Sequence, residues 1–190
     1  MGDKHSVKTT FFGTTSVYVT DGSSSIFIDA FLSRPSLLRV AFGKLGPDIT
    51  LIKETLRSAN ITRCDGIFVA HSHYDHALDA PEVAKLLGSR IYGSDSTLNI
   101  ARGSGYPKSP SSSSVSMMCT IDAPLVLPGK TSDMKDGGRY SFRIAHPEGS
   151  MLIHPSANFV PNKFSNLNVD VLYLGIGVLG AQPSEFQESY

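Results

Sequence analysis

The sequence predicts an α/β domain, and three observations support this fold class. Strand and turn signals open the chain, with a hairpin signal at Asp21-Gly22. Between residues 49 and 92, segments with helical spacing of apolar residues alternate with short apolar runs. Two further runs, at 150–153 and 169–174, are expected to be strands, and the second is expected to be buried. Strands that alternate with helices indicate a layered α/β architecture.

Three short strands are expected first, over residues 9–12, 16–20 and 25–28, where apolar and polar side chains largely alternate. The third strand ends at Asp29. A carboxylate at a strand end has two interpretations. It can form a turn, or it can be the hydrogen-bond partner of a metal-bound histidine.

A predicted loop covers residues 33–48, which are interrupted by proline and glycine. Asp48 then suits a helix N-cap. The following apolar residues recur at helical spacing and predict an amphipathic helix over 49–59, with Ile49, Ile52, Leu56 and Ala59 as core residues.

A short buried strand is expected at 66–70 because its residues are apolar without alternation. Asp79 and Glu82 have the spacing of a capping box, so the next helix is expected to begin there and to stop at Gly88. A strand follows at 90–92.

The middle of the chain is rich in serine and proline, and residues 106–116 are predicted to be a linker-like stretch. Strands are expected again at 140–145, 150–153 and 169–174, with a tight turn at 146–149. The whole chain, 1–190, is interpreted as a single domain.

One hexapeptide, His71-Ser72-His73-Tyr74-Asp75-His76, stands out directly after the strand expected at 66–70. It holds three of the six histidines in the chain, together with a carboxylate. Imidazole nitrogen and carboxylate oxygen are ligands that zinc favours. If the strand extended through His71 and His73, their side chains would point the same way. We therefore predict a metal site for one or two ions, zinc or another divalent metal.

The hexapeptide resembles the His-x-His-x-Asp-His signature of the metallo-β-lactamase fold hydrolases. The opening hairpin that ends in Ile28-Asp29 and the helices on either side of the motif are similar to the first half of that fold. Residues 152–161 and 169–177 resemble the start of its second half. The resemblance implies a four-layer αβ/βα sandwich, here with a shortened second half.

This resemblance also implies site residues and a reaction. It places His71 and His73 on a first metal, and Asp75 and His76 on a second. Asp75 would also orient the nucleophilic water. The implied function is hydrolysis of an ester, lactone or phosphodiester-type bond in a small molecule by metal-bound water or hydroxide.

The chain departs from the family pattern at three further ligands. A third histidine is expected well downstream, where His146 is the nearest candidate, but His146 is predicted to start a turn. A bridging aspartate is expected just after residues 151–153, where His154 is the tentative ligand instead. A final histidine has no counterpart after His154. Two hypotheses follow: a metal-dependent hydrolase with a depleted ligand set, or a non-catalytic or truncated relative.

Bulk properties limit the possible partners. The formal net charge is zero, so we expect no nucleic-acid partner. No apolar run approaches the roughly 20 residues of a membrane span, so we expect no membrane partner. With two cysteines and no apolar leader, the chain is expected to be cytoplasmic.

Overall fold

The structure is a computed structural model that describes residues 6–106, 120–157, 160–177 and 179–189. Its contacts divide the chain into two compact units, Met1–Arg139 and Tyr140–Tyr190, which we consider one at a time. The linker-like stretch expected at 106–116 lies outside the described residues apart from Tyr106. One domain over the whole chain therefore stays a prediction.

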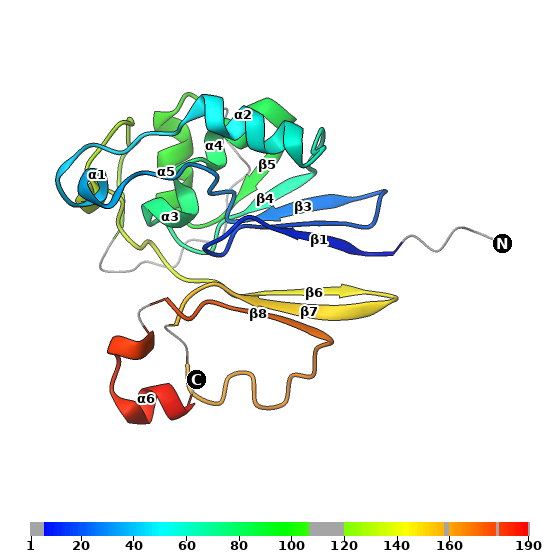
Figure 1. The fold of residues 1–190 in the computed structure, drawn as a ribbon. Helices are drawn as coiled ribbons and strands as arrows, with labels where there is room; N and C mark the ends of the chain where they lie inside the picture. Colours follow the sequence, from blue (N-terminus) through cyan, green and yellow to red (C-terminus); the bar gives the residue numbers. More distant parts are fainter. Residues whose placement is uncertain (1–5, 107–119, 158–159, 178, 190) are drawn as a thin grey trace. The chain divides into compact units, whose positions relative to one another are not determined.

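The first unit is built on a five-stranded sheet with the strands in sequence order (Figure 1). Its strands are β1 (Lys8–Phe11), β2 (Val17–Thr20), β3 (Ser25–Ile28), β4 (Gly66–Phe68) and β5 (Arg90–Tyr92). The β1–β2 and β2–β3 pairs are antiparallel, whereas β3, β4 and β5 run parallel. These strands confirm the predicted ones to within about two residues, the usual uncertainty of element ends.

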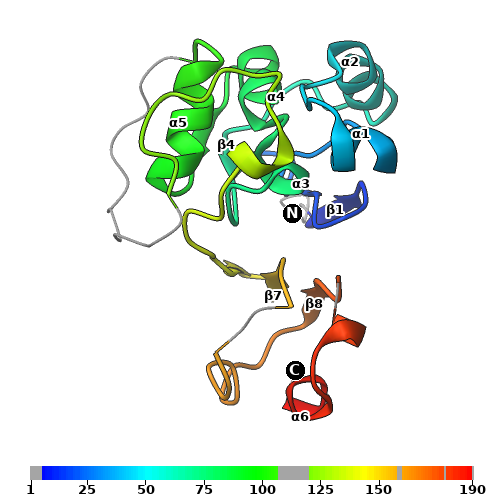
Figure 2. The same cartoon turned by 90° about the vertical axis from the view of Figure 1, so that its left-hand side faces the viewer.

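Three helices lie together on one side of this sheet, as Figures 1 and 2 show: α2 (Ile49–Ser58), α4 (Ala80–Leu87) and α5 (Asp95–Gly103). Asp48 caps α2 as predicted, because its carboxylate accepts from the Leu51 amide at 3.0 Å. Ile52 and Leu56 are buried in the core cluster and Ala59 packs against it, as predicted. Ile49 was also expected in the core but is 37% exposed, because it lies in the first turn of the helix. The helix α5 was not predicted.

The capping box expected at Asp79 is wrong. Asp79 precedes α4 but makes no side-chain capping bond. Its carboxylate instead accepts from the amides of Leu32 and Ser33 at 2.7 and 2.5 Å, and from the Ser33 hydroxyl at 2.8 Å. A buried carboxylate needs such partners, and the loop after β3 supplies them. The pair Asp79 and Glu82 has capping-box spacing, but a tertiary contact decides where the Asp79 side chain goes.

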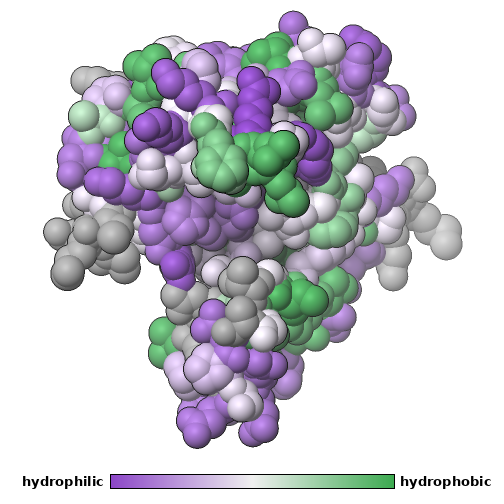
Figure 3. Space-filling model, turned by 60° about the vertical axis from the view of Figure 1, so that its left-hand side comes forward, coloured by the Kyte–Doolittle hydropathy of each residue, from purple (hydrophilic) through white to green (hydrophobic). Residues whose placement is uncertain are grey.

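The predicted loop at 33–48 contains a short helix, α1 (Leu37–Phe42), none of whose residues is buried. Leu37, Leu38 and Phe42 are each at least 75% exposed. Figure 3 shows apolar (green) side chains gathered on the surface of this unit. The missed helix is explained by its lack of a core-facing stripe, which is the main sequence signal of a helix.

The second unit contains a three-stranded sheet of β6 (Phe142–His146), β7 (Gly149–His154) and β8 (Val171–Leu174). The β6–β7 pair is antiparallel and the β7–β8 pair is parallel. The helix α6 (Ser184–Ser189) follows. The predicted turn between β6 and β7 is confirmed. The strand β8 was expected to be buried, but three of its four residues are exposed.

Two sheets with helices confirm the predicted α/β class with a shorter second half. Among the described residues, no helix is long and apolar enough to cross a bilayer.

Candidate metal centre

The histidine motif lies on a loop and a short helix at the end of β4. Because β4 ends at Phe68, the strand does not continue through His71 and His73. The helix α3 (Tyr74–Ala77) begins directly after His73 and carries Asp75 and His76. The rings of His71 and His73 are nevertheless close, with centroids 4.8 Å apart and planes at 80°. The loop, rather than strand alternation, brings them together.

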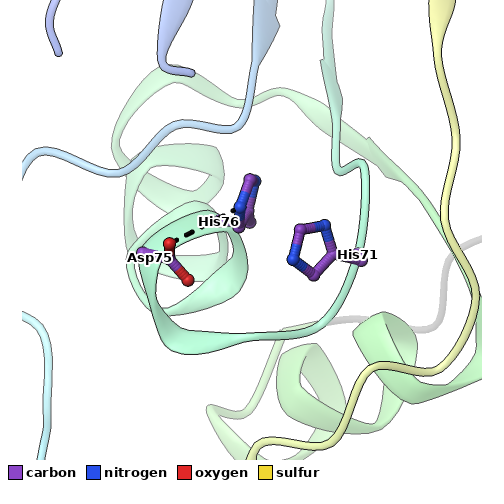
Figure 4. Close-up of side chains that lie close together, drawn as sticks. All are labelled: His71, Asp75 and His76. Atoms are coloured by element: carbon purple, nitrogen blue, oxygen red, sulfur yellow. Dashed lines mark ion pairs between the residues drawn. The ribbon is translucent and has the colours of Figure 1, made fainter. Parts of the chain in front are cut away.

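His71 belongs to two groups of possible metal ligands. His71, Asp75 and His76 each offer one ligand atom, and these atoms lie within 4.8 Å of one another. His71, His73 and Asp136 meet the same limit. Figure 4 shows His71 beside His76, with Asp75 on α3 close to the His76 ring. The His71 and His76 ring centroids are 3.7 Å apart, and Asp75 Oδ2 lies 3.6 Å from His76 Nε2.

Asp29 orients His76. This is the second of the two roles that the sequence suggested for Asp29. Its carboxylate oxygen Oδ2 lies 2.8 Å from His76 Nδ1 and accepts a 2.8 Å hydrogen bond from the Thr15 hydroxyl. The other oxygen accepts from the Ala70 amide at 2.7 Å. Asp29 has a positive φ of 46°, an uncommon conformation for this residue type. A histidine whose Nδ1–H is held by a carboxylate presents Nε2 to a metal.

The pKa values of the two buried histidines are shifted in opposite directions. Burial, assisted by the charges of His76, His73 and Arg139, lowers the pKa of His71 to about 2. Burial also works against a charged His76, but the adjacent Asp29 carboxylate outweighs it and raises the pKa of His76 above its ordinary value. His71 is therefore neutral at physiological pH, as a metal ligand must be.

A cluster of buried hydroxyl groups supports the motif loop. Ser72 Oγ lies 3.1 Å from Ser94 Oγ and 3.0 Å from Thr97 Oγ1, both at the start of α5. The Ser72 amide donates to the carbonyl oxygen of Asp136 at 2.8 Å. Residues far apart in sequence thus fix the backbone between His71 and His73.

Sequence reasoning missed Asp136, which lies some sixty positions after the motif in a loop without a recognisable pattern. No signal in the sequence singles it out. The structure brings it beside His71 and His73. Two buried atoms of this group, His71 Nδ1 and Asp136 Oδ1, have no hydrogen-bond partner among the described residues. Unpartnered buried polar atoms are rare, so a metal ion fits this donor set.

The two downstream histidines lie in the second unit. His154 ends β7, where its Nδ1 is 2.6 Å from the Ser141 hydroxyl and its ring packs edge-on against Phe164. Burial lowers the pKa of His154. His146 Nδ1 accepts from the Glu148 amide at 3.2 Å within the turn. The tentative assignment of His154 as a ligand stays a prediction.

A family model, described as the metallo-beta-lactamase superfamily, matches residues 9–156. The chain belongs to this superfamily. The match includes the hexapeptide His71–His76, Asp29 and Asp136. The fold class and family resemblance inferred from the sequence are thereby confirmed. No curated protein matches the chain.

Two solved structures are similar to the chain. The metallo hydrolase Igni18 of the archaeon Ignicoccus hospitalis KIN4/I is 16% identical with a TM-score of 0.38, covering 79% of this chain and 57% of that one. CmlA, a diiron beta-hydroxylase from Streptomyces venezuelae, is 16% identical with a TM-score of 0.49, covering 97% of this chain and 40% of that one. The chain thus spans about half the length of these neighbours.

Proposed function

We propose that the chain is a metal-dependent hydrolase that cleaves an ester, lactone or phosphodiester-type bond in a small molecule. Its proposed metal ligands are His71, His73, Asp75 and His76, with His154 kept as tentative. One observation carries the proposal: His71, Asp75 and His76 converge while the buried carboxylate of Asp29 holds His76. Membership of a superfamily rich in hydrolases supports it.

The metal would supply the activation of water. A bound divalent ion lowers the pKa of water to near 7 and polarises the substrate oxygen. Zinc suits two imidazoles and a carboxylate, and other divalent ions are compatible with the same donors.

The protein residues would bind the ion and handle the proton. His71 and His76 are both buried, and each offers a ring nitrogen to the same group of possible ligands. The side chain of Asp75 is about a third exposed (35%), so it can reach a water molecule that enters from solvent. We propose that this carboxylate orients the attacking water and accepts its proton.

A second candidate is a non-catalytic relative that keeps the fold with a reduced ligand set. The sequence has His154 where the family's bridging aspartate is expected, and this difference favours it. We also propose a cytoplasmic location, because the sequence has only two cysteines and one of them, Cys64, is buried and free.

The test is hydrolysis by the full chain loaded with zinc or manganese. The substrates are p-nitrophenyl acetate, a fatty-acyl lactone and bis-p-nitrophenyl phosphate. We expect turnover of at least one of them, reduced about 100-fold or more in His73→Ala. The non-catalytic alternative predicts the same background rate for wild type and variant.

A matched variant, His146→Ala, removes an imidazole from the β6–β7 turn. We expect its rate to equal that of the wild type. A loss as large as that of His73→Ala would show that histidine removal in general, and not loss of the motif, lowers the rate.

A further inference from the structure

The carboxylate of Asp136 lies beside two histidines of the motif. One oxygen of Asp136 and one nitrogen each of His71 and His73 are within 4.8 Å of one another. We propose that Asp136 is a metal ligand and that these three residues form a first metal position with two imidazoles and one carboxylate. This inference rests on the proposed function in one respect: both require that the motif binds metal.

The chain fixes Asp136 at both its backbone and its side chain. Its carbonyl oxygen accepts from the amide of Ser72, which lies between the two histidines. Its Oδ2 accepts from Arg139 Nε at 2.7 Å. Hydrogen bonds of this kind orient the carboxylates that bind metals. The backbone of Asp136 is therefore held by a bond to the motif itself, and its side chain by a bond within its own loop.

The second carboxylate oxygen of Asp136 shows whether this residue only forms a surface ion pair or could also bind a metal. Arg139 occupies Oδ2, whereas Oδ1 is buried and has no partner among the described residues. His71 Nδ1 is buried without a partner in the same group. His71 is only 5% exposed, so water does not readily satisfy it. A cation held by this group of residues would supply the kind of partner that buried polar atoms need.

Gly137 explains how the loop approaches so closely. Its φ is +67°, and a Cβ built there would lie 2.4 Å from Ser96 Cβ. Any side chain would therefore push the loop away from α5 and from the motif. Gly88 has nearly the same φ, +66°, but open space around it. Comparing substitutions at Gly137 and Gly88 therefore distinguishes the effect of the loop's close packing from the effect of the left-handed backbone conformation.

The proposed ligand set has a consequence for metal choice. A carboxylate adds a negative charge and a hard oxygen donor where a third histidine would be neutral. Oxygen donors favour manganese and iron(II) relative to an all-imidazole set, while two histidines and a carboxylate also bind zinc. We expect the preference for zinc over manganese to be weaker in the wild type than in Asp136→His.

The experiment counts and ranks bound ions in the metal-free full chain. Native mass spectrometry follows titration with Zn²⁺ and Mn²⁺ separately, and circular dichroism verifies folding. The wild type is expected to bind two ions. Asp136→Asn keeps the shape of the side chain and is expected to weaken one of them about 100-fold or more. Asp136→His is expected to restore the second zinc but not the second manganese.

Two controls complete the design. Asp95→Asn, at an exposed residue in the first turn of α5, is expected to bind both ions as the wild type does. Gly137→Ala is expected to weaken the same ion as Asp136→Asn, whereas Gly88→Ala leaves both unchanged.

Each failure has a separate meaning. If Asp136→Asn binds both ions with wild-type affinity, Asp136 is not a ligand and the inference is overturned, while the proposed function stands. If the wild type binds no ion, the proposed metal-dependent function fails, and the inference fails with it.

Discussion

At the scale of single residues, Asp29 connects the fold to the candidate chemistry. It ends β3, adopts a positive φ, and uses both carboxylate oxygens to hold the Ala70 amide, the Thr15 hydroxyl and His76. Backbone strain of this kind costs about 1–3 kcal/mol and persists where surrounding contacts enforce it. The sequence left open whether Asp29 forms a turn or orients a histidine, because that choice depends on a partner 47 positions away.

Replacing Asp29 with asparagine is expected to weaken metal binding. Asparagine has one acceptor oxygen where Asp29 has two, so it cannot accept from both the Ala70 amide and Nδ1–H of His76, and the tautomer of His76 is held less firmly. We expect about a 10- to 100-fold lower zinc affinity, measured by competition with a chromophoric chelator. Asp122→Asn, at an exposed site, serves as the control. Equal affinities for wild type and Asp29→Asn would argue against an orienting role.

His71 makes the metal-free protein sensitive to acid. Its pKa is about 2 in the folded chain and about 6.5 when unfolded, so the folded state disfavours the charged form. Such a group contributes stability above pH 6.5 that is lost as the pH falls. His76, with a raised pKa, acts in the opposite direction, so a variant comparison is needed.

The comparison is between wild type and His71→Asn in urea unfolding with a chelator present. Between pH 7 and pH 5, the wild type should lose up to about 2 kcal/mol of unfolding free energy relative to the variant. A difference between the two proteins that does not change with pH would contradict a neutral, buried His71.

At the scale of elements, two aspartates that both precede helices have different roles. Asp48 caps α2 through the Leu51 amide, whereas Asp79 accepts three hydrogen bonds from the loop at Leu32 and Ser33. Local sequence predicts the first role because the cap and its partner are three residues apart. It cannot predict the second, because the partner loop lies 46 and 47 positions away.

Alanine substitutions should separate these two roles. Asp48→Ala removes an exposed cap and is expected to cost about 1 kcal/mol. Asp79→Ala leaves buried donors without an acceptor and should cost about 3 kcal/mol or more. Chemical denaturation measures both. A cost for Asp79→Ala no larger than for Asp48→Ala would mean that its buried bonds contribute little.

The helices α1 and α2 should also respond differently. Phe42 of α1 is 88% exposed, whereas Ile52 of α2 is fully buried. Phe42→Ala is expected to change the unfolding free energy by less than about 0.5 kcal/mol. Ile52→Ala should cost about 2–5 kcal/mol by leaving a cavity. A large cost at Phe42 would indicate that α1 is covered in solution.

At the scale of the whole chain, most of the first unit follows from local sequence patterns. Alternation predicts β2 and β3, helical spacing predicts α2, and the apolar run predicts β4. The motif His71–His76 was found for the same reason, since its residues are contiguous. Asp136 and the partners of Asp79 could not be found, because they are brought in by tertiary contacts that leave no periodic signal.

The most direct test of the metal centre uses the residue that both ligand groups share. His71 belongs to the group with Asp75 and His76 and to the group with His73 and Asp136. Native mass spectrometry of the metal-free full chain, titrated with zinc, compares wild type, His71→Asn and His146→Asn. We predict two bound ions in wild type and His146→Asn, and at most one in His71→Asn, because the first metal position loses a ligand. Zinc binding by His71→Asn at the wild-type level, or none in the wild type, would contradict a metal centre at this motif.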